Sequence, residues 1–190
     1  MTGGWYGDAE LRALGLGALG EDVRIDASAQ LINPSKIFIN SHVRIDAFAF
    51  LNAGPEGIHI GDHVHIAAGV YIFGGNGRVE LGAFAGLAAR VSLYTATDDY
   101  SGEFMTNPTV PDRYKRVQCG PVILGRHALV GAGAVIMPGV TLALGAGVGA
   151  LSYLNAPVGE FEFFDGRPAR KIGKRHRGLL RLEQELNDTP

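Results

Sequence analysis

The chain has little of what stabilises secreted or membrane-spanning proteins. Its 190 residues include one cysteine, Cys119, which excludes a disulfide within the chain. No apolar stretch approaches the roughly 20 residues that a helix needs to span a bilayer, and no signal-like segment is present. We therefore expect a cytoplasmic protein without a membrane span, in a compartment that keeps thiols reduced.

The chain also lacks a strong excess of either charge. It has 17 basic and 19 acidic residues and a formal net charge of −2. This balance argues against a polyanion-binding protein, and no aromatic platform accompanies the basic residues, so nucleic acid is not an expected partner. Cys119 could act as a nucleophile, but a single thiol at the end of a loop is more often inert.

What the chain has instead is a six-residue repeat of aliphatic side chains. Ile, Leu and Val fill 45 of 190 positions, yet they occupy all fifteen positions of five triplets. Equivalent members of the first three triplets are 21 residues apart, and those of the last two are 18 apart. The fifteen positions are Ile39, Ile45, Leu51, Ile60, Ile66, Ile72, Leu81, Leu87, Leu93, Leu124, Val130, Ile136, Leu142, Val148 and Leu154.

A second set of positions follows the same repeat. Four residues after each aliphatic position, 13 of 15 residues are Ala, Val, Ser or Thr, and the exceptions are Pro55 and Asn76. Positions 0 and 4 of a strand share a face, so each hexad describes one edge of a triangular coil. Stacked coils bury one continuous column of aliphatic side chains. The sequence therefore predicts an all-β fold, a parallel β-helix of about six coils from near Val23 to near Leu154.

The repeat is interrupted once, and the ends of the chain differ from it. Between residues 94 and 123 the rhythm stops, which predicts a loop extruded from the β-helix; such long loops are commonly functional. We expect an N-terminal segment over residues 1–22 with a short helix at 8–16 capped by Asp8. The β-helix would cover 23–158, and a basic segment with a helix at 178–186 would cover 159–190.

Several segments together resemble the hexapeptide-repeat sugar acetyltransferases. They are residues 87–93, 121–125, 130–133 and 136–141, the extruded loop, and the Gly-Arg-Pro-Ala-Arg sequence at 166–170. The resemblance implies a left-handed β-helix, a homotrimer with active sites between subunits, and direct acetyl transfer from acetyl-CoA without a metal. Relatives include galactoside O-acetyltransferases and nucleotide-sugar N-acetyltransferases. Residues 98–102 (Asp-Asp-Tyr-Ser-Gly) are more similar to the second group.

The resemblance places Asp98 at a position of mechanistic interest. Galactoside-type members carry a histidine there as general base, whereas this chain has an aspartate. An aspartate with an ordinary pKa near ~3.9 is a weak base for a hydroxyl group but can orient an ammonium group. This favours the amino group of a nucleotide-linked amino-deoxysugar, such as a dTDP-4-amino-4,6-dideoxyhexose of surface-polysaccharide (O-antigen) synthesis. O-acetylation of a galactoside or polysaccharide is the alternative, and Asp98 could also be a turn residue.

Neighbouring polar residues of the loop are candidates for holding the sugar. Asp99, Tyr100, Glu103 and Asn107 offer the hydrogen-bonding groups that sugar hydroxyls require. A solvated surface loop is the alternative interpretation.

The histidines offer a competing general base. Stacking of the hexads places His42 and His63 in one outward column with Phe84 and His127, close enough for His42 and His63 to touch. His65 lies in the adjacent column, and either His65 or His63 could act as base towards a neighbouring subunit's loop. Stacked histidines also raise a zinc hydratase as a remote alternative. A non-catalytic β-helix scaffold is the other.

The donor site is expected on the last coils. Matching of the family motif places Ala132, Ala150, Asn155 and Arg170 at coenzyme A contacts, with Lys171 beside them. Small residues would let the pantetheine arm approach the backbone. Six cations within residues 167–177 would suit its phosphates, although a solvated basic tail would have the same composition.

Overall fold

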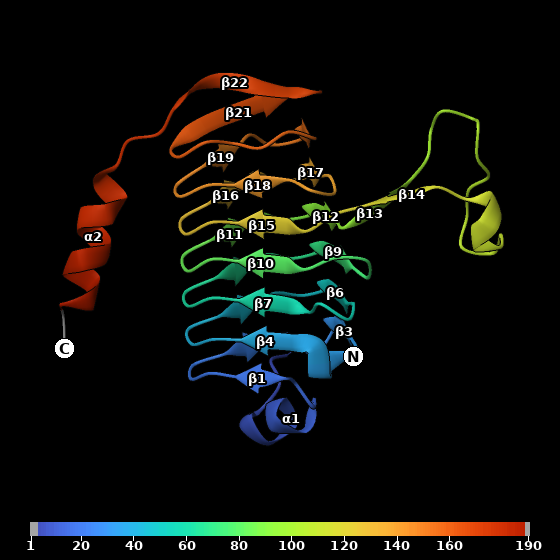
Figure 1. Cartoon of the computed structure of the whole chain (residues 1–190). Helices are drawn as coiled ribbons and strands as arrows, with labels where there is room; N and C mark the ends of the chain where they lie inside the picture. The colour runs from blue at the N-terminus through green and yellow to red at the C-terminus, as the bar shows by residue number, and fades with distance from the viewer. Residues whose placement is uncertain (1–3, 189–190) are drawn as a thin grey trace.

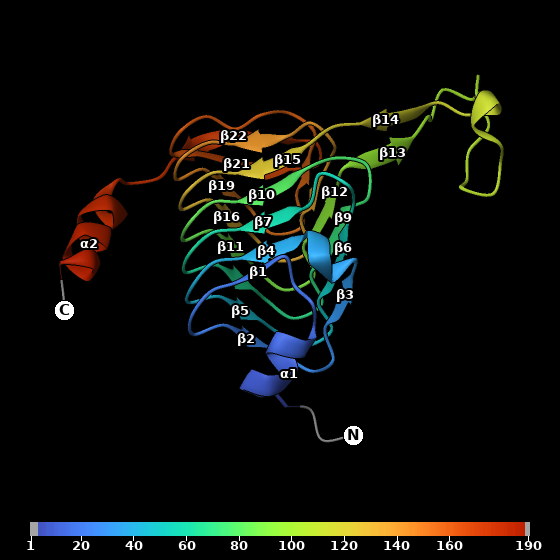
Figure 2. The same ribbon diagram turned by 60° about the horizontal axis from the view of Figure 1, so that its bottom comes forward.

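The computed structural model describes residues 4–188, and its body is a triangular prism of stacked coils (Figure 1). Each coil contributes one short strand to each of three parallel sheets, and the coils wind in a left-handed sense. Figure 2 shows the three sheets from the N-terminal end. The expected all-β, left-handed parallel β-helix is confirmed.

The strands of each sheet follow one another at intervals of one coil. The first sheet contains β1 (Ala18–Leu19), β4 (Ile37–Ile39), β7 (Ile58–Ile60), β10 (Val79–Leu81), β15 (Val122–Leu124) and β18 (Thr141–Leu142). The second contains β2 (Arg24–Ile25), β5 (Arg44–Ile45), β8 (His65–Ile66), β11 (Gly86–Leu87), β16 (Leu129–Val130) and β19 (Gly147–Val148). The third contains β3 (Gln30–Ile32), β6 (Phe50–Ala53), β9 (Tyr71–Gly74), β12 (Ser92–Tyr94), β17 (Val135–Ile136) and β20 (Tyr153–Leu154).

The aliphatic repeat forms the core. All fifteen repeat positions are at most 2% exposed. The strand register stacks them as predicted: Ile60 pairs with Ile39 on one side and Leu81 on the other, and Leu81 pairs with Leu124. Burial of each such side chain contributes about 1.5–3 kcal/mol, so this column is the main source of stability.

The six predicted coils are present, but the ladder begins earlier than residue 23. β1 pairs with β4 through Ala18 and Leu19. Of the positions four residues after each aliphatic one, the two exceptions Pro55 and Asn76 are exposed at the corner of the longer coils. There the extra residues shift the pattern, and Ile58 and Val79 occupy the buried sites instead.

Both terminal helices form, with differences in detail. Helix α1 (Asp8–Ala13) begins after Gly7, which is the N-cap; Asp8 is the first helical residue, so its predicted role as cap is wrong. The backbone N–H of Gly7 donates to Glu10 at 2.8 Å, which closes the first turn. Helix α2 (Gly178–Asn187) has no buried residue and runs beside the β-helix (Figure 1). No helix in the part of the chain that the structure describes is long and apolar enough to cross a membrane.

The segment before α2 is a β-hairpin that the sequence did not predict. β21 (Glu162–Gly166) adds to β19 of the second sheet, and β22 (Ala169–Lys174) pairs antiparallel with β21. The hairpin covers the end of the coil stack, as Figure 1 shows, and so protects an edge that would otherwise be open. The Gly-Arg-Pro-Ala-Arg sequence at 166–170 forms its turn.

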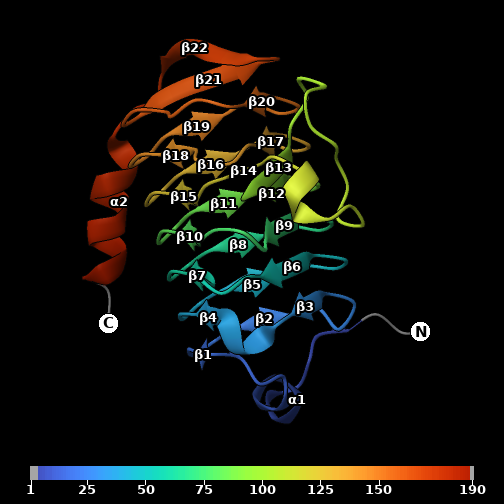
Figure 3. The same cartoon turned by 45° about the vertical axis from the view of Figure 1, so that its right-hand side comes forward.

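The extruded loop leaves the prism after β12 and returns at β15, where the interruption was predicted. Its base is a two-stranded antiparallel ribbon of β13 (Ala96–Asp98) and β14 (Val117–Cys119). Beyond the ribbon the chain forms a 3-10 turn, η2 (Asp112–Tyr114); a second one, η1 (Pro34–Lys36), lies at a corner of the second coil. The loop projects well away from the prism (Figure 1), and Figure 3 shows it leaving from the side of the third sheet, next to β12.

Candidate active site

Asp98 stands at the outer end of the ribbon. It is the last residue of β13 and pairs with Val117 across the ribbon. Its side chain is partly exposed. Because the antiparallel backbone fixes β13, the carboxylate is presented from a regular element rather than from a flexible turn.

Asp99 is bonded within the loop. Its side chain is nearly enclosed, at 7% exposure, and its Oδ1 accepts hydrogen bonds from the backbone N–H and the hydroxyl of Ser101. These hydrogen bonds from Ser101 hold the pKa of Asp99 below its usual range. Asp99 thus closes the turn that follows β13. Its predicted role in binding the sugar stays a prediction.

The other loop candidates face solvent. Tyr100 is 89% exposed, and Glu103 and Asn107 are also exposed. The loop is ordered by its own side chains: the Arg116 guanidinium lies over the ring of Phe104 at 5.7 Å. These residues form an outward-facing polar surface that no other part of the described chain covers.

The predicted histidine column is present as a ladder of stacked rings. His42 and His63 are 4.6 Å apart between centroids, His63 and Phe84 are 4.6 Å apart, and Phe84 and His127 are 4.8 Å apart. All four residues have left-handed φ angles of about 60° at the corner between the first and second sheets. We call these four residues the corner ladder. Both faces of the His63 ring are covered by its neighbours.

The corner ladder is bonded to a carboxylate at each end. His42 Nδ1 lies 3.3 Å from Asp22 Oδ2 in the preceding coil. His127 Nε2 lies 2.8 Å from Glu183 Oε2 of helix α2, and the other Glu183 oxygen accepts from Arg126 at 3.0 Å. These contacts attach α2 to the prism.

His65 lies in the adjacent column, as predicted, and has a partner that was not predicted. Its Nε2 is 2.9 Å from Oδ2 of Asp46 in the preceding coil, whose Oδ1 accepts from Arg44 Nε at 2.6 Å. Burial raises the pKa of Asp46, but the hydrogen bonds from Arg44 and His65 outweigh it and leave the pKa below its usual value. The register could have found Asp46, since it stands two residues after Arg44, which pairs with His65.

A single chain does not place Asp98 beside these histidines. The ribbon leaves the prism after the third sheet, whereas His65 lies on the second sheet and His63 at its corner with the first. Figure 1 shows the ribbon and loop projecting away from the coils. An active site that contains both Asp98 and one of these histidines must therefore take one of the two residues from another chain.

The predicted donor residues lie on the last coils. Ala132 is partly exposed, and Ala150 and Asn155 are exposed. The backbones here are very close: a Cβ built on Gly131 would lie 2.5 Å from the backbone nitrogen of Ala150. Only glycine permits this approach, which leaves a smooth outer surface at the two alanines.

The basic residues at 167–177 divide into two groups. Arg175 is structural, because its guanidinium donates to the carbonyl groups of His127, Gly145 and Ala146 at 3.0, 2.8 and 3.2 Å; burial lowers its pKa. Arg177 lies over the ring of Phe161 at 4.6 Å.

The other four basic residues stay near the surface. Lys171 pairs with Glu162, and Arg167 donates to the carbonyl of Leu151. Arg170 and Lys174 are exposed. The exposed members are the ones able to meet an anionic nucleotide.

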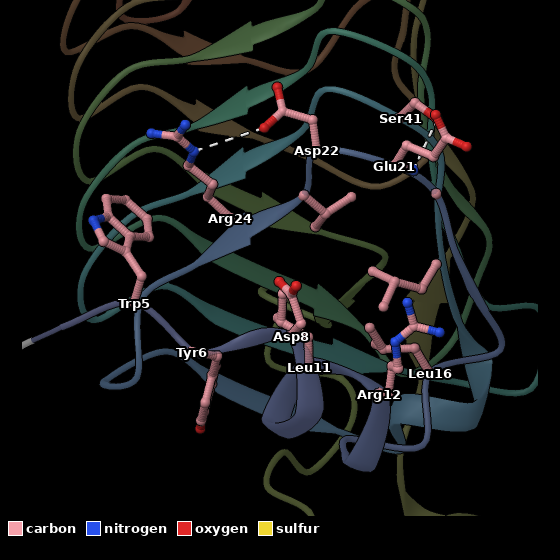
Figure 4. A pocket seen from close by; sticks show the side chains of 13 residues that line it. Trp5, Tyr6, Asp8, Leu11, Arg12, Leu16, Glu21, Asp22, Arg24 and Ser41 are labelled. Carbon is pink, nitrogen blue, oxygen red and sulfur yellow. Dashed lines mark hydrogen bonds and ion pairs between the residues drawn. The ribbon is translucent and has the colours of Figure 1, made fainter.

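Two cavities lie outside this constellation. The larger, about 960 Å³, opens between α1 and the first coil, where Asp8, Arg12, Asp22 and Arg24 bring charges of both signs (Figure 4). A smaller one, about 590 Å³, lies under the ribbon and includes Cys119, whose thiol is exposed. Within residues 4–188 no three His, Cys, Asp or Glu side chains converge as a metal site would require.

Comparison with known proteins defines the class first. The family described as the hexapeptide repeat of succinyl-transferase matches residues 51–73 and 121–156. The chain is 38% identical over 176 residues, 93% of this chain and 91% of the relative, to a dTDP-4-amino-4,6-dideoxy-D-glucose acyltransferase of Escherichia coli. The chain belongs to the hexapeptide-repeat acyltransferase family, whose members take acyl groups from coenzyme A thioesters.

Solved structures show which members of that family the chain resembles in fold and sequence. A serine-to-alanine variant of AntD, an N-acyltransferase from Bacillus cereus, in complex with dTDP-4-amino-4,6-dideoxyglucose and coenzyme A, has a TM-score of 0.93 and 36% identity over 98% of both chains. AntD in complex with dTDP and 3-hydroxybutyryl-CoA has a TM-score of 0.94 and 37% identity over 97% of both chains.

Proposed function

We propose that this protein transfers an acyl group from a coenzyme A thioester to the amino group of a dTDP-linked 4-amino-4,6-dideoxyhexose. The observation that carries the proposal is the structural similarity, over 98% of both chains, to an N-acyltransferase variant that binds dTDP-4-amino-4,6-dideoxyglucose together with coenzyme A. The Escherichia coli relative is a dTDP-4-amino-4,6-dideoxy-D-glucose acyltransferase, so its name gives the same amino sugar. We place the reaction in the cytoplasm and in the synthesis of a surface polysaccharide such as O-antigen.

The proposed reaction is a direct attack of the sugar amine on the thioester. The carboxylate of Asp98 orients the ammonium group and favours its approach from the ribbon. Tyr100, Glu103 and Asn107 supply hydrogen bonds to the sugar from the exposed loop surface. Asp99 contributes mainly by holding the turn next to Asp98, because its Oδ1 is already bonded to Ser101.

The donor would lie along the last coils. The pantetheine arm would follow the backbone at Ala132 and Ala150, where the glycine-rich coils leave a smooth surface. Asn155, Arg170 and Lys171 would contact the remaining polar and phosphate groups. No metal takes part in this chemistry.

We further propose a homotrimer with active sites between subunits. The loop of one chain extends away from the corner of its own coils that carries the histidines, so a neighbouring subunit would supply the other side of the active site. The solvent-facing loop residues would then be covered by that neighbour.

A thiol-release assay tests the proposal. Purified protein is supplied with acetyl-CoA or 3-hydroxybutyryl-CoA and a panel of dTDP-linked amino sugars and matching hydroxy sugars. We expect thiol release with the 4-amino sugar and none with the hydroxy sugar. Turnover of a galactoside or hydroxy sugar without turnover of any amino sugar would support O-acylation instead and refute N-acyl transfer.

Ligand-induced stabilisation tests the donor site separately. A ligand that binds only the native state at 100 times its Kd stabilises the protein by about 2.7 kcal/mol, and the melting temperature rises accordingly. We expect this rise with millimolar coenzyme A and a smaller one in Arg170→Ala. An unchanged melting temperature in the unaltered protein would contradict the donor assignment.

A further inference from the structure

The corner between the second and third sheets carries small residues in four successive coils, with one cation among them. Its residues are Ala-Ala-Gly at 67–69, Ala-Ala-Arg at 88–90, Gly-Ala-Gly at 131–133 and Gly-Ala-Leu at 149–151. The backbone N–H of Arg90 donates to the carbonyl of Ala68 at 3.0 Å, and that of Gly133 donates to Ala89 at 2.9 Å. Arg90 is therefore stacked directly between two uncharged corners.

The backbone of Arg90 has the left-handed conformation, with a φ angle of 61°. The equivalent residues of the coils before and after it are Gly69 and Gly133, with φ angles of 65° and 68°. Glycine adopts this conformation without strain, whereas a residue with a Cβ atom is disfavoured there. The fold of the corner therefore gives no reason for an arginine at this position.

Arg90 also differs from the other arginines of the coils, because it has no acidic partner. Each of the other four forms an ion pair with a carboxylate of the same chain: Arg24 with Asp22, Arg44 with Asp46, Arg78 with Glu80, and Arg126 with Glu183. Arg90 is exposed, and within residues 4–188 its guanidinium has no hydrogen-bond or ion-pair partner. Its charge is thus available to an anion from outside the chain.

The proposed donor site leads to Arg90. In the proposed function the phosphates of coenzyme A meet Arg170 and Lys171 on the hairpin, and the pantetheine arm follows Ala150 and Ala132 towards the earlier coils. Because β21 pairs with β19, β19 with β16 and β16 with β11, the next coil in this direction is that of Arg90, about 4.8 Å further on. The thioester is at the end of the arm opposite to the nucleotide, so the acceptor has to meet it near this coil.

The acceptor of the proposed reaction carries charges of both signs. Its amino group, on C4 of the hexose, is positively charged, and Asp98 is the proposed partner of that group. Its diphosphate, on C1 at the opposite end of the ring, is negatively charged and needs a cation. A guanidinium group can donate two parallel hydrogen bonds to phosphate oxygens.

We propose that Arg90 binds the diphosphate group of the nucleotide-sugar acceptor. This rests on the proposed function, to which it adds a residue that selects a nucleoside-diphosphate sugar over a free sugar. Within one chain, β12 separates Arg90 from the ribbon that carries Asp98, so the two residues act on one acceptor from neighbouring subunits.

Calorimetric titration of dTDP, dTMP and coenzyme A into the unaltered protein and into Arg90→Met tests the assignment. Methionine keeps the aliphatic stem but removes the cation. Loss of hydrogen bonds to a charged group costs about 10–100-fold in affinity, so we expect the Kd of dTDP to rise by this factor. The Kd of dTMP, which lacks the second phosphate, should rise less, and that of coenzyme A should stay within twofold.

Arg90→Gly separates binding from folding, because glycine occupies the equivalent positions at Gly69 and Gly133. We expect this variant to melt no lower than the unaltered protein and to bind dTDP as weakly as Arg90→Met does. The matched control is Arg24→Met, which removes an exposed arginine from the second sheet and should leave all three Kd values within twofold.

Steady-state kinetics give a second readout. A contact to the diphosphate is made equally in the ground state and the transition state, because the diphosphate takes no part in the chemistry. We therefore expect Arg90→Met to raise the KM for the dTDP-amino sugar by about 10–100-fold, with kcat and the KM for acyl-CoA within threefold.

The outcomes separate the two proposals. Failure of the unaltered protein both to bind dTDP and to acylate any dTDP-linked amino sugar would refute the proposed function. Binding of dTDP by the unaltered protein, together with an unchanged Kd in Arg90→Met and Arg90→Gly, would overturn only the role of Arg90. A greater loss for coenzyme A than for dTDP would overturn it as well, because Arg90 would then belong to the donor site.

Discussion

Asp46 is a carboxylate whose ionisation is coupled to folding. Its pKa in the folded protein lies below the ordinary value of 3.8 because Arg44 and His65 donate to it. Stability from a carboxylate with a depressed pKa is fully present above the unfolded-state value and is lost as pH falls through the folded-state value. Asp46 therefore stabilises the protein at neutral pH and ceases to do so in acid, below about pH 4.

This predicts the pH dependence of Asp46→Asn. At pH 7 the substitution should lower the free energy of unfolding by roughly 1–2 kcal/mol, as loss of a charge-assisted hydrogen bond does. The difference from the unaltered protein should shrink towards pH 3. Urea unfolding at both pH values measures it, with Asp22→Asn as control because that aspartate is 59% exposed. A difference that is constant with pH would show that the ionised carboxylate is not what stabilises the fold.

Arg175 allows a second prediction at the same scale. Its guanidinium donates to three backbone carbonyl groups at the corner of the late coils. Arg175→Met keeps the aliphatic stem but removes the donor to the carbonyl groups of His127 and Gly145, whereas that of Ala146 still accepts from Leu129, so we expect the free energy of unfolding to fall by about 2–3 kcal/mol. The exposed neighbour Lys174, changed to Ala, should shift it by less than about 0.5 kcal/mol. Equal effects of the two variants in urea unfolding would contradict a structural role for Arg175.

Helix α2 is loosely attached to the rest of the molecule. It has no buried residue, and Leu182 and Leu186 are 55% and 51% exposed. Glu183 joins it to the prism through His127 and Arg126. An element with so few buried contacts is expected to open at a low free-energy cost.

This predicts that Glu183→Ala releases α2 without unfolding the coils. Amide hydrogen exchange should become several-fold faster in residues 178–187, while the core strands keep their protection. Gln184→Ala, on the same helix, is the control and should leave exchange unchanged or slow it, because alanine favours helix. Unchanged exchange in Glu183→Ala would mean that the Glu183 contacts are not what holds the helix.

The strands of the β-helix could be predicted from the sequence because each coil repeats the same pattern of aliphatic and small residues. Ile60, Ile66 and Ile72 occupy three edges of one coil, and their equivalents one coil later pair with them, so the register follows from counting residues. The same counting found the stacked His42 and His63 rings. It failed where the period ends: β21 and β22 alternate too weakly among charged residues to be recognised, and Gly7 rather than Asp8 caps α1.

Side-chain roles were harder to predict than positions. The hydrogen bonds between Asp99 and Ser101 could not be predicted, because composition does not reveal which loop side chains bond to one another. Arg175 looked like part of a phosphate site, but it caps carbonyl groups. In contrast, the contact of Asp46 with His65 could have been predicted from the register, since Asp46 stands two residues after Arg44, which pairs with His65.

At the scale of the whole molecule, the separation of Asp98 from Arg90 makes a test of assembly possible. Asp98→Asn and Arg90→Met are each expected to lower activity strongly when the sugar is below its KM. If the loop and the coil surface of a site come from different subunits, mixed trimers contain sites in which both residues are intact. Random mixing of equal amounts should restore about a quarter of the sites.

The measurement is acyl transfer after the two variants are unfolded together and refolded, with size-exclusion chromatography and light scattering to determine the oligomer. Each variant refolded alone is the control. Activity that stays at the level of the separate variants would mean that both residues act within one chain, or that one of them does not act at all.

The stacking of the coils also divides the length of the prism into equal steps, one for each coil. Each coil touches only the one before and the one after it, as the pairing of Ile60 with Ile39 and Leu81 illustrates. A duplicate of residues 61–81 placed after Leu81 would have the original coil on one side and the coil that begins at Gly82 on the other, and its aliphatic positions would again stack on aliphatic positions. Each added coil would lengthen the prism by one strand spacing, about 4.8 Å. The distance between the two ends of the molecule could thus be increased stepwise without a change to either end.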